Sequence, residues 1–363
     1  MEAVTGWRLP GRGVHIPALD GLRTVAIVPV LLVHLDYASG GFIGVTLFFA
    51  LSGFLIASLL LEELDRTETI RLKSFYIRRM ARLYPALLAM IIMAVVIGLT
   101  TGKDPIGMFL VAIIAGTYTA NLVASTTGVW LPLMNHTWTL AQEEQFYLVA
   151  PWLLRKMNLL RMRRWAIGIA VLAVLLAGLR LGVTMTVPEL YRFTYENPVL
   201  NLDSMLAGVA LAMVLRRGVV PRWIETLASS RAVILVAFSA LVFAIFWAKL
   251  DGWTMSIATS ITTVATLSIL AHICFRQSAW TQVLSFRWMR WVGERVYGIY
   301  LYHVPIFVLL GVKEIEGPLE RALMSMAATA LSVAVAALSS RWIEQPVRSW
   351  VRNRSRQPAA VTV

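Results

Sequence analysis

Long apolar stretches alternate along the chain with short polar segments that are rich in arginine. About eleven stretches come near the roughly 20 residues that an α-helix needs to cross a bilayer. They cover residues 18–37, 41–61, 83–101, 106–124, 138–154, 165–183, 199–215, 232–248, 254–274, 295–312 and 322–341. This pattern predicts an all-α, polytopic membrane protein.

The composition excludes the other broad classes of protein. Hydrophobic residues make up 58% of the chain and charged residues 15%, against about 45–50% and 25% in soluble domains. The mean hydropathy of +0.71 also argues against disorder. Cys274 is the single cysteine, so an intramolecular disulfide is impossible. The five histidines lack the HExxH spacing of a helical zinc site, and we expect no metal or permanent cofactor.

The positive charge of the chain predicts its orientation. The net charge is +13, which first suggests nucleic acid, but the basic residues gather between apolar stretches, as they do on the cytoplasmic side of membrane helices. If all stretches crossed, most of these clusters would lie outside. The stretch 106–124 carries Thr117, Tyr118, Thr119 and Asn121, so we expect it to be re-entrant or interfacial. The prediction is then about ten transmembrane helices with both termini cytoplasmic.

This topology divides the chain into three parts. Residues 1–17 form a cytoplasmic N-terminal segment without a secretory signal pattern. Residues 18–345 form the membrane domain, and residues 346–363 form a basic cytoplasmic tail. We expect no second domain after the last helix.

Ionisable residues inside the apolar stretches are candidates for a functional site, because burying them in a membrane is costly. Arg23 and His34 lie eleven residues apart, which places them on one helix face with roughly 16 Å of rise between them. In the predicted topology Arg23 is near the cytoplasmic surface and His34 is in the outer half. Asp20 either caps this helix or orients Arg23. For His34 alone, a packed structural histidine is an equally good interpretation.

The stretch that begins near residue 138 contains Glu143 and Glu144, which the topology also places in the outer half. A histidine and a carboxylate at one depth suit general base catalysis, since the carboxylate orients the imidazole and stabilises its protonated form. Alternatively, the two glutamates only mark the start of a helix. Tyr147, which follows in the same stretch, is a candidate for the lining of a cavity.

Arginines at the predicted inner surface provide a second kind of candidate. Arg79 and Arg82 open the third helix, and a guanidinium group suits phosphate, although such a basic run is often only a topological anchor. His303 lies within an apolar helix and either lines a cavity or belongs to the core. Arg180 and Asp203 lie at similar depths and could form a buried, structural ion pair.

Six motifs, in order along nearly the whole chain, resemble the family-three membrane acyltransferases. They are IPALDGLRTVAIVPVLLVHL, GFIGVTLFFALSGFLIASLL, FYIRRMARLYP, HTWTLAQEEQFYLVAPWL, YGIYLYHVPIF and WIEQPVR. The resemblance implies about ten membrane spans and an acyl-CoA donor on the cytoplasmic side. Carried over by motif, the family's functional residues fall on Arg23 and His34, on Arg79 and Arg82, and on Glu143. Thr139 stands where the family usually has serine.

The resemblance therefore implies an O-acyltransferase of the bacterial inner membrane. It would move an acyl group, most simply acetyl from acetyl-CoA, to a hydroxyl of a cell-envelope glycan or glycolipid. Acylation of a small secondary metabolite such as a macrolide is an alternative acceptor. A transporter or flippase for a lipid-linked sugar is the alternative of another class, although the internal repeats typical of transporters are not evident. The expected partners are acyl-CoA, a hydroxyl-bearing acceptor and membrane lipid, and not nucleic acid.

Overall fold

A computed structural model describes residues 8–11, 14–216 and 220–354 of the chain. Within these residues the regular elements are helices, apart from one isolated β-bridge between Gly11 and Val14. The all-α prediction is therefore confirmed. The remaining positions, which include parts of the predicted N-terminal segment and basic tail and Arg217 of one basic cluster, lie outside the described residues.

The helices belong to two compact units that are interleaved in the sequence. The first unit takes its residues from Met1–Ile70, Asn121–Val129 and Trp138–Gly293. Its helices are α1 (Pro17–His34), α2 (Ile43–Thr67), α5 (Ala120–Thr127, from Asn121 on), α6 (Trp138–Lys156), α7 (Met162–Thr186), α8 (Tyr191–Glu196), α9 (Asp203–Arg216), α10 (Arg222–Ser229), α11 (Arg231–Trp247), α12 (Trp253–Phe275), α13 (Ala279–Leu284) and α14 (Arg287–Gly293), with short 3₁₀ turns at Leu159–Arg161 and Pro188–Leu190.

The second unit takes its residues from Arg71–Ala120, Trp130–Thr137 and Glu294–Val363. Its helices are α3 (Leu72–Thr100), α4 (Pro105–Gly116), η1 (Asn135–Thr137), α15 (Val296–Leu309), η4 (Val312–Glu314), α16 (Pro318–Ser339), the π-helical turn η5 (Ser340–Glu344) and α17 (Gln345–Arg354).

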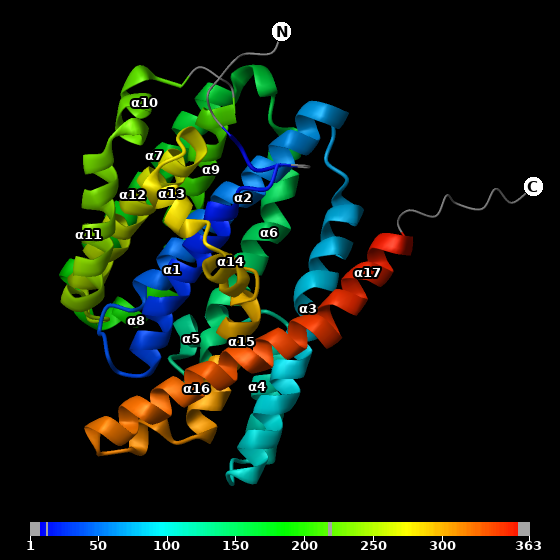
Figure 1. The fold of residues 1–363 in the computed structure, drawn as a ribbon, viewed down its shortest axis with the longest axis vertical. Coiled ribbons are helices and arrows are strands. Elements are labelled where there is room, and N and C mark those ends of the chain that lie inside the picture. The colour runs from blue at the N-terminus through cyan, green and yellow to red at the C-terminus, as the bar shows by residue number, and fades with distance from the viewer. Residues whose placement is uncertain (1–7, 12–13, 217–219, 355–363) are drawn as a thin grey trace, which may run out of the picture. The chain divides into compact units, whose positions relative to one another are not determined.

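Helix α2 is the centre of the first unit, where it packs against α1, α6, α9 and α12 (Figure 1). Glycines allow its closest contacts. A Cβ atom at Gly53 would lie 2.0 Å from the carbonyl oxygen of Met205, and one at Gly208 would lie 2.1 Å from that of Ala50. Since no side chain fits at either position, α2 and α9 approach each other backbone to backbone, as small residues permit between membrane helices.

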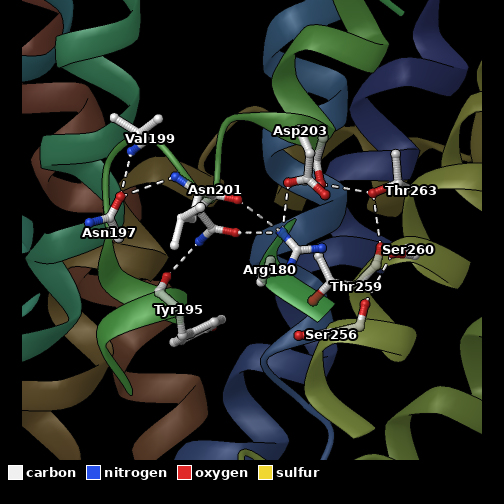
Figure 2. Close-up of polar contacts among 12 residues, drawn as sticks. Arg180, Tyr195, Asn197, Val199, Asn201, Asp203, Ser256, Thr259, Ser260 and Thr263 are labelled. Carbon is white, nitrogen blue, oxygen red and sulfur yellow. Dashed lines mark hydrogen bonds and ion pairs between the residues drawn. The ribbon is translucent and has the colours of Figure 1, made fainter. Parts of the chain in front are cut away.

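A buried polar cluster joins α7, α9 and α12 in the same unit. Figure 2 shows Arg180 of α7, whose Nη1 donates to Asp203 of α9 over 2.8 Å. The predicted ion pair is therefore confirmed. The cluster extends to α12, because the hydroxyls of Ser204 and Thr263 are 2.8 Å apart. Hydroxyls and an ion pair thus hold three apolar helices in one register.

In the second unit, α15 packs against α16 and α3, and two tyrosines of α15 make specific polar contacts. The hydroxyl of Tyr297 donates to the carbonyl of Leu83 over 2.8 Å. The hydroxyl of Tyr302 lies 2.9 Å from that of Ser339. Buried tyrosine hydroxyls need such partners, and here they join α15 to α3 and α16.

The helices agree with most of the predicted stretches, with two differences in detail. The third helix begins at Leu72 rather than near residue 83, so Arg79 and Arg82 lie inside α3 instead of opening it. Arginine and lysine favour helices, which explains why the helix continues beyond its apolar part. The stretch 106–124 is not one helix, because α4 ends at Gly116 and α5 starts at Ala120, with Tyr118 in the left-handed conformation (φ 55°) between them.

Six candidate spans occur in the described residues, and up to eight if each of two broken pairs, α4 with α5 and α10 with α11, counts as one span. The six are Pro17–His34, Ile43–Thr67, Leu72–Thr100, Leu159–Thr186, Trp253–Phe275 and Pro318–Arg354. Helices α9 and α15, with 14 residues each, are shorter than the usual span of about 20 residues. The count of ten crossings stays a prediction.

Candidate functional site

The N-terminal end of α1 carries a small network of charged and polar side chains around Asp20. This carboxylate is buried and accepts hydrogen bonds from Arg23 and from the imidazole of His15, the latter over 2.6 Å. The N-cap of α1 is Ile16, which makes no side-chain cap. Of the two roles expected for Asp20, the structure therefore supports the orientation of Arg23 and not the capping of the helix.

His34 is the last residue of α1 and is half-buried. It shares one continuous helix with Arg23, so the expected rise of about 16 Å between the two residues applies. Pro29 lies inside this helix between them. Arg23 thus lies in the second turn of α1, and His34 lies at the C-terminal end of the same helix.

Glu143 lies on α6, six residues into the helix, and is half-buried. The hydroxyl of Ser52 on α2 donates a hydrogen bond of 2.7 Å to its Oε1 atom. Next to it, Asn121 bonds to Gln145 over 2.9 Å, and Gln142 donates to the carbonyl of Pro198 over 2.7 Å. Glu143 therefore lies among hydrogen-bonded polar side chains of the first unit and does more than mark the start of α6.

Tyr147 lies four residues after Glu143, and only 4% of it is exposed. Its ring meets that of Phe146 edge to face. No cavity among those described in the structure is lined by Tyr147, so its place in a cavity stays a prediction.

The contacts between α1 and α2 show which residues of the two helices lie at the same height along the helix axes. A Cβ atom at Gly41 would lie 2.1 Å from the carbonyl oxygen of Pro29, and one at Gly44 would lie 2.4 Å from that of Ala26. The two helices are therefore antiparallel neighbours. Ser52 lies eight residues beyond Gly44, about 12 Å farther along α2 and toward the N-terminal end of α1.

It follows that Ser52, which donates to Glu143, lies nearer the level of Arg23 than that of His34. The expectation that the carboxylate orients the imidazole required the two groups to share one depth. These contacts give the level of Ser52 only, so the pairing of Glu143 with His34 stays a prediction.

Arg79 and Arg82 lie on α3 in the second unit, where Arg79 is half-buried and Arg82 exposed. Arg82 interacts electrostatically with Glu344, a residue of the π-helical turn η5 that is only 4% exposed. Glu344 also accepts a hydrogen bond of 2.6 Å from Arg348. We did not predict this carboxylate, although the motif WIEQPVR contains it and π-helical turns are frequent at functional sites.

A second group in this unit contains two buried histidines. His303 is completely buried, and its Nδ1 donates to the carbonyl of Tyr300 over 2.7 Å. Its ring lies edge to face with that of His136, with 5.4 Å between the ring centres. The Nε2 of His136 donates to the carbonyl of Leu301 over 3.0 Å. The motif that contains Glu143 begins with His136, so its position in that motif was the available signal.

In the described part of the chain, no three His, Cys, Asp or Glu side chains come together to hold a metal ion. The structure does bring Asp20 to Arg23 and Ser52 to Glu143. These two pairs of polar groups lie on apolar helices, and α1 and α2 are long and apolar enough to cross a membrane, which is the arrangement of a helical membrane protein.

A family model described as an acyltransferase domain matches residues 16–341. The chain therefore belongs to this acyltransferase family, which is a family of enzymes and the one that the six motifs resemble.

Curated relatives agree with this assignment. The chain is 34% identical to the peptidoglycan O-acetyltransferase OatA of Listeria monocytogenes, over 92% of this chain and 56% of the relative. It is 31% identical to the O-acetyltransferase OatA of Staphylococcus aureus, over 92% of this chain and 57% of the relative. The chain thus spans a little over half the length of these relatives. No solved structure matches it significantly.

Proposed function

We propose that the chain is a membrane O-acetyltransferase that acts on a hydroxyl of a cell-envelope glycan. The observation that carries this proposal is the match of the acyltransferase domain to residues 16–341, together with relatives that are named O-acetyltransferases. The name of the Listeria relative specifies peptidoglycan, and this favours a glycan over a small secondary metabolite as the acceptor.

The proposed setting is the inner membrane of a bacterium, with ten crossings and both termini cytoplasmic. The ten spans are α1, α2, α3, α6, α7, α9, α11, α12, α15 and α16. The broken pair α4 and α5 would be the re-entrant segment. The basic clusters between the spans support this orientation. Arg23 is then near the cytoplasm and His34 near the outer surface.

The proposed donor is acyl-CoA, most simply acetyl-CoA, from the cytoplasm. Its phosphates would meet the guanidinium groups of Arg23, Arg79 and Arg82, since arginine binds phosphate through paired N–H groups. Its pantetheine arm would extend along α1 toward His34. The rise of about 16 Å from Arg23 to His34 suits such an extended arm.

In this scheme His34 is the general base. Its imidazole takes the proton from the acceptor hydroxyl while the oxygen attacks the thioester carbonyl. The new C–O bond forms, the C–S bond breaks, and the thiolate of CoA leaves with the electron pair. The imidazolium then returns the proton to the thiolate, so that free thiol and an O-acyl ester are the products.

For Glu143 the orientation of His34 stays a prediction, and we also propose a place for this carboxylate on the path of the donor. The carboxylate, held by Ser52, would accept hydrogen bonds from the amide N–H groups of the pantetheine arm. The level of Ser52 along α2, nearer Arg23 than His34, supports this assignment.

The test compares the wild-type chain with His34→Ala and His34→Gln in membrane vesicles. Acetyl-CoA and a glycan acceptor are supplied, and thiol release and ester formation are measured together. Loss of a general base lowers the rate about 10²- to 10⁴-fold. Normal expression and monodispersity of both variants show that they fold. Full activity in both variants would remove His34 from the mechanism, and translocation of a sugar lipid without thiol release by the wild type would favour a transporter.

A further inference from the structure

A cavity of about 930 Å³ lies in the first unit, at the N-terminal end of α1. The segment before α1 forms one wall, and the end of α12 with the turn into α13 forms the other. Its volume falls within the range of about 300–1,000 Å³ that small-molecule sites occupy. The functional residues carried over from the family motifs do not line this cavity.

The walls of the cavity combine positive charge with apolar surface. Arg8, His15 and Arg276 all line the cavity. Gln277 adds an amide, while Ile273 and Phe275 contribute apolar groups. Among its described lining residues there is no aspartate or glutamate. This combination suits an anion attached to an apolar or planar body, because arginine forks bind phosphate and apolar walls bind a ring.

Backbone contacts hold the N-terminal wall in place. The N–H of Arg8 donates to the carbonyl of Cys274 over 2.6 Å, which fixes this segment on the end of α12. Gly11 and Val14 then bond to each other in both directions, over 3.2 and 3.3 Å. Backbone hydrogen bonds therefore fix the described residues of this wall at Arg8, Gly11 and Val14.

Two consecutive hydrogen bonds connect the cavity with α1. His15 lines the cavity and bonds to Asp20, which in turn bonds to Arg23. The carboxylate of Asp20 thus has both of its oxygens engaged, one by each residue. A ligand that occupies the cavity would lie next to the residue at which the proposed donor path along α1 begins.

We propose that this cavity binds the phosphorylated nucleotide end of the acyl donor. Arg8 and Arg276 would bind the 3′-phosphate on its ribose, which leaves the diphosphate to the arginines of the proposed donor path, and the apolar wall of Ile273 and Phe275 would receive the adenine ring. This inference rests on the proposed function for the identity of the donor. The inference that the cavity binds a phosphorylated nucleotide is argued from its lining residues alone. A phospholipid headgroup shares the phosphate chemistry, so the experiment has to separate the two sources.

The experiment measures binding of adenosine 3′,5′-bisphosphate to the purified full-length protein in nanodiscs of neutral lipid. We compare the wild type with Arg8→Ala, Arg276→Ala and the conservative Arg276→Lys. Arg222→Ala serves as the matched control, because Arg222 is an exposed arginine of the same unit outside the cavity. Losing a hydrogen bond to a charged group weakens binding about tenfold or more. We expect that loss for both alanine variants, partial recovery for Arg276→Lys, and wild-type binding for Arg222→Ala.

The same variants are assayed for thiol release from acetyl-CoA. We expect KM for acetyl-CoA to rise about tenfold in the two alanine variants, while kcat at saturating donor changes little. Unchanged adenosine bisphosphate binding in both variants, with wild-type thiol release intact, overturns this inference and leaves the proposed function standing. Weakened binding in both variants, without thiol release by the wild type, supports the nucleotide site and contradicts the proposed function.

A third arm repeats the binding measurement in nanodiscs that contain phosphatidylglycerol. If the cavity holds a lipid headgroup, this anionic lipid competes with the nucleotide in the wild type, and the competition disappears in Arg8→Ala and Arg276→Ala. That outcome assigns the cavity to lipid and overturns the proposal. Equal affinity in both kinds of nanodisc supports the nucleotide.

Discussion

Arg180 and Asp203 form an ion pair of 2.8 Å in which the side chains are only 1% and 4% exposed. The guanidinium also points Nη1 toward the carbonyl of Leu200 and the side chain of Asn201, each at 3.4 Å. Its Nε and Nη2 atoms have no hydrogen-bond partner among the described residues. Asp203 therefore provides the main compensation for a buried positive charge, and the pair ties α7 to α9.

We predict that breaking this pair is far more damaging than replacing it. Asp203→Leu leaves the buried guanidinium without its carboxylate, and Arg180→Met leaves the carboxylate without its cation. Each should lower the free energy of unfolding by about 3–5 kcal/mol. The double variant Arg180→Met with Asp203→Leu removes both charges and should be more stable than either single variant. Denaturation in detergent measures all three, and additive losses in the double variant would contradict the assignment.

A second prediction concerns the hydrogen bond from Ser52 to Glu143. Ser52→Ala removes the hydroxyl that donates to the carboxylate of Glu143. It should raise KM for acetyl-CoA about tenfold or more, because removal of a hydrogen bond to a charged group costs about 1.5–3 kcal/mol. Ser52→Thr should recover most of the activity. Ser58→Ala is the matched control, since Ser58 lies on the same helix and bonds only to its own helix at Phe54. If Ser52→Ala and Ser58→Ala behave alike, this hydrogen bond has no role in catalysis.

Asp20 provides a third prediction, because it orients Arg23. Asp20→Asn keeps the size of the side chain but removes its charge, so the guanidinium of Arg23 loses a charge-assisted hydrogen bond. We expect KM for acetyl-CoA to rise about tenfold while kcat changes little. Glu189→Gln, which removes an exposed carboxylate, should leave both constants unchanged. A fall in kcat without a change in KM would show that Asp20 acts on the chemical step instead.

The close contact of α2 with α9 gives a fourth prediction. Gly53→Leu places a side chain where the carbonyl oxygen of Met205 lies 2.0 Å from the Cβ position. Overpacking typically costs about 1–3 kcal/mol or more, so the variant should lose thermal stability or fail to accumulate. Gly182→Leu on α7 is the control, because nothing lies within 4 Å of its Cβ position. Equal stability of the two variants, measured by thermal denaturation in detergent, would show that the two backbones can separate without cost.

The sequence predicted the fold class and the approximate position of nearly every long helix. Apolar stretches of membrane length are a local property, so α2, α7 and α12 could be placed without knowing their neighbours. The buried pair of Arg180 and Asp203 was also predictable, since an unpaired charge inside an apolar helix is costly and the two opposite charges lie at similar depths. The start of α3 was missed, because a charged helix turn carries no apolar signal.

By itself, the sequence determined that this chain is a helical membrane protein with ionisable groups inside its spans, and the order of its motifs indicated the acyltransferase family. Only the tertiary structure decided which of these groups meet. In the folded chain Ser52 donates a hydrogen bond to Glu143, and Glu344 lies near Arg82. Arg8 and Arg276, which are far apart in the chain, line one cationic cavity. The physical reason is that hydrophobic length and helix propensity act along the chain, whereas hydrogen bonds and cavities depend on which helix faces are packed together.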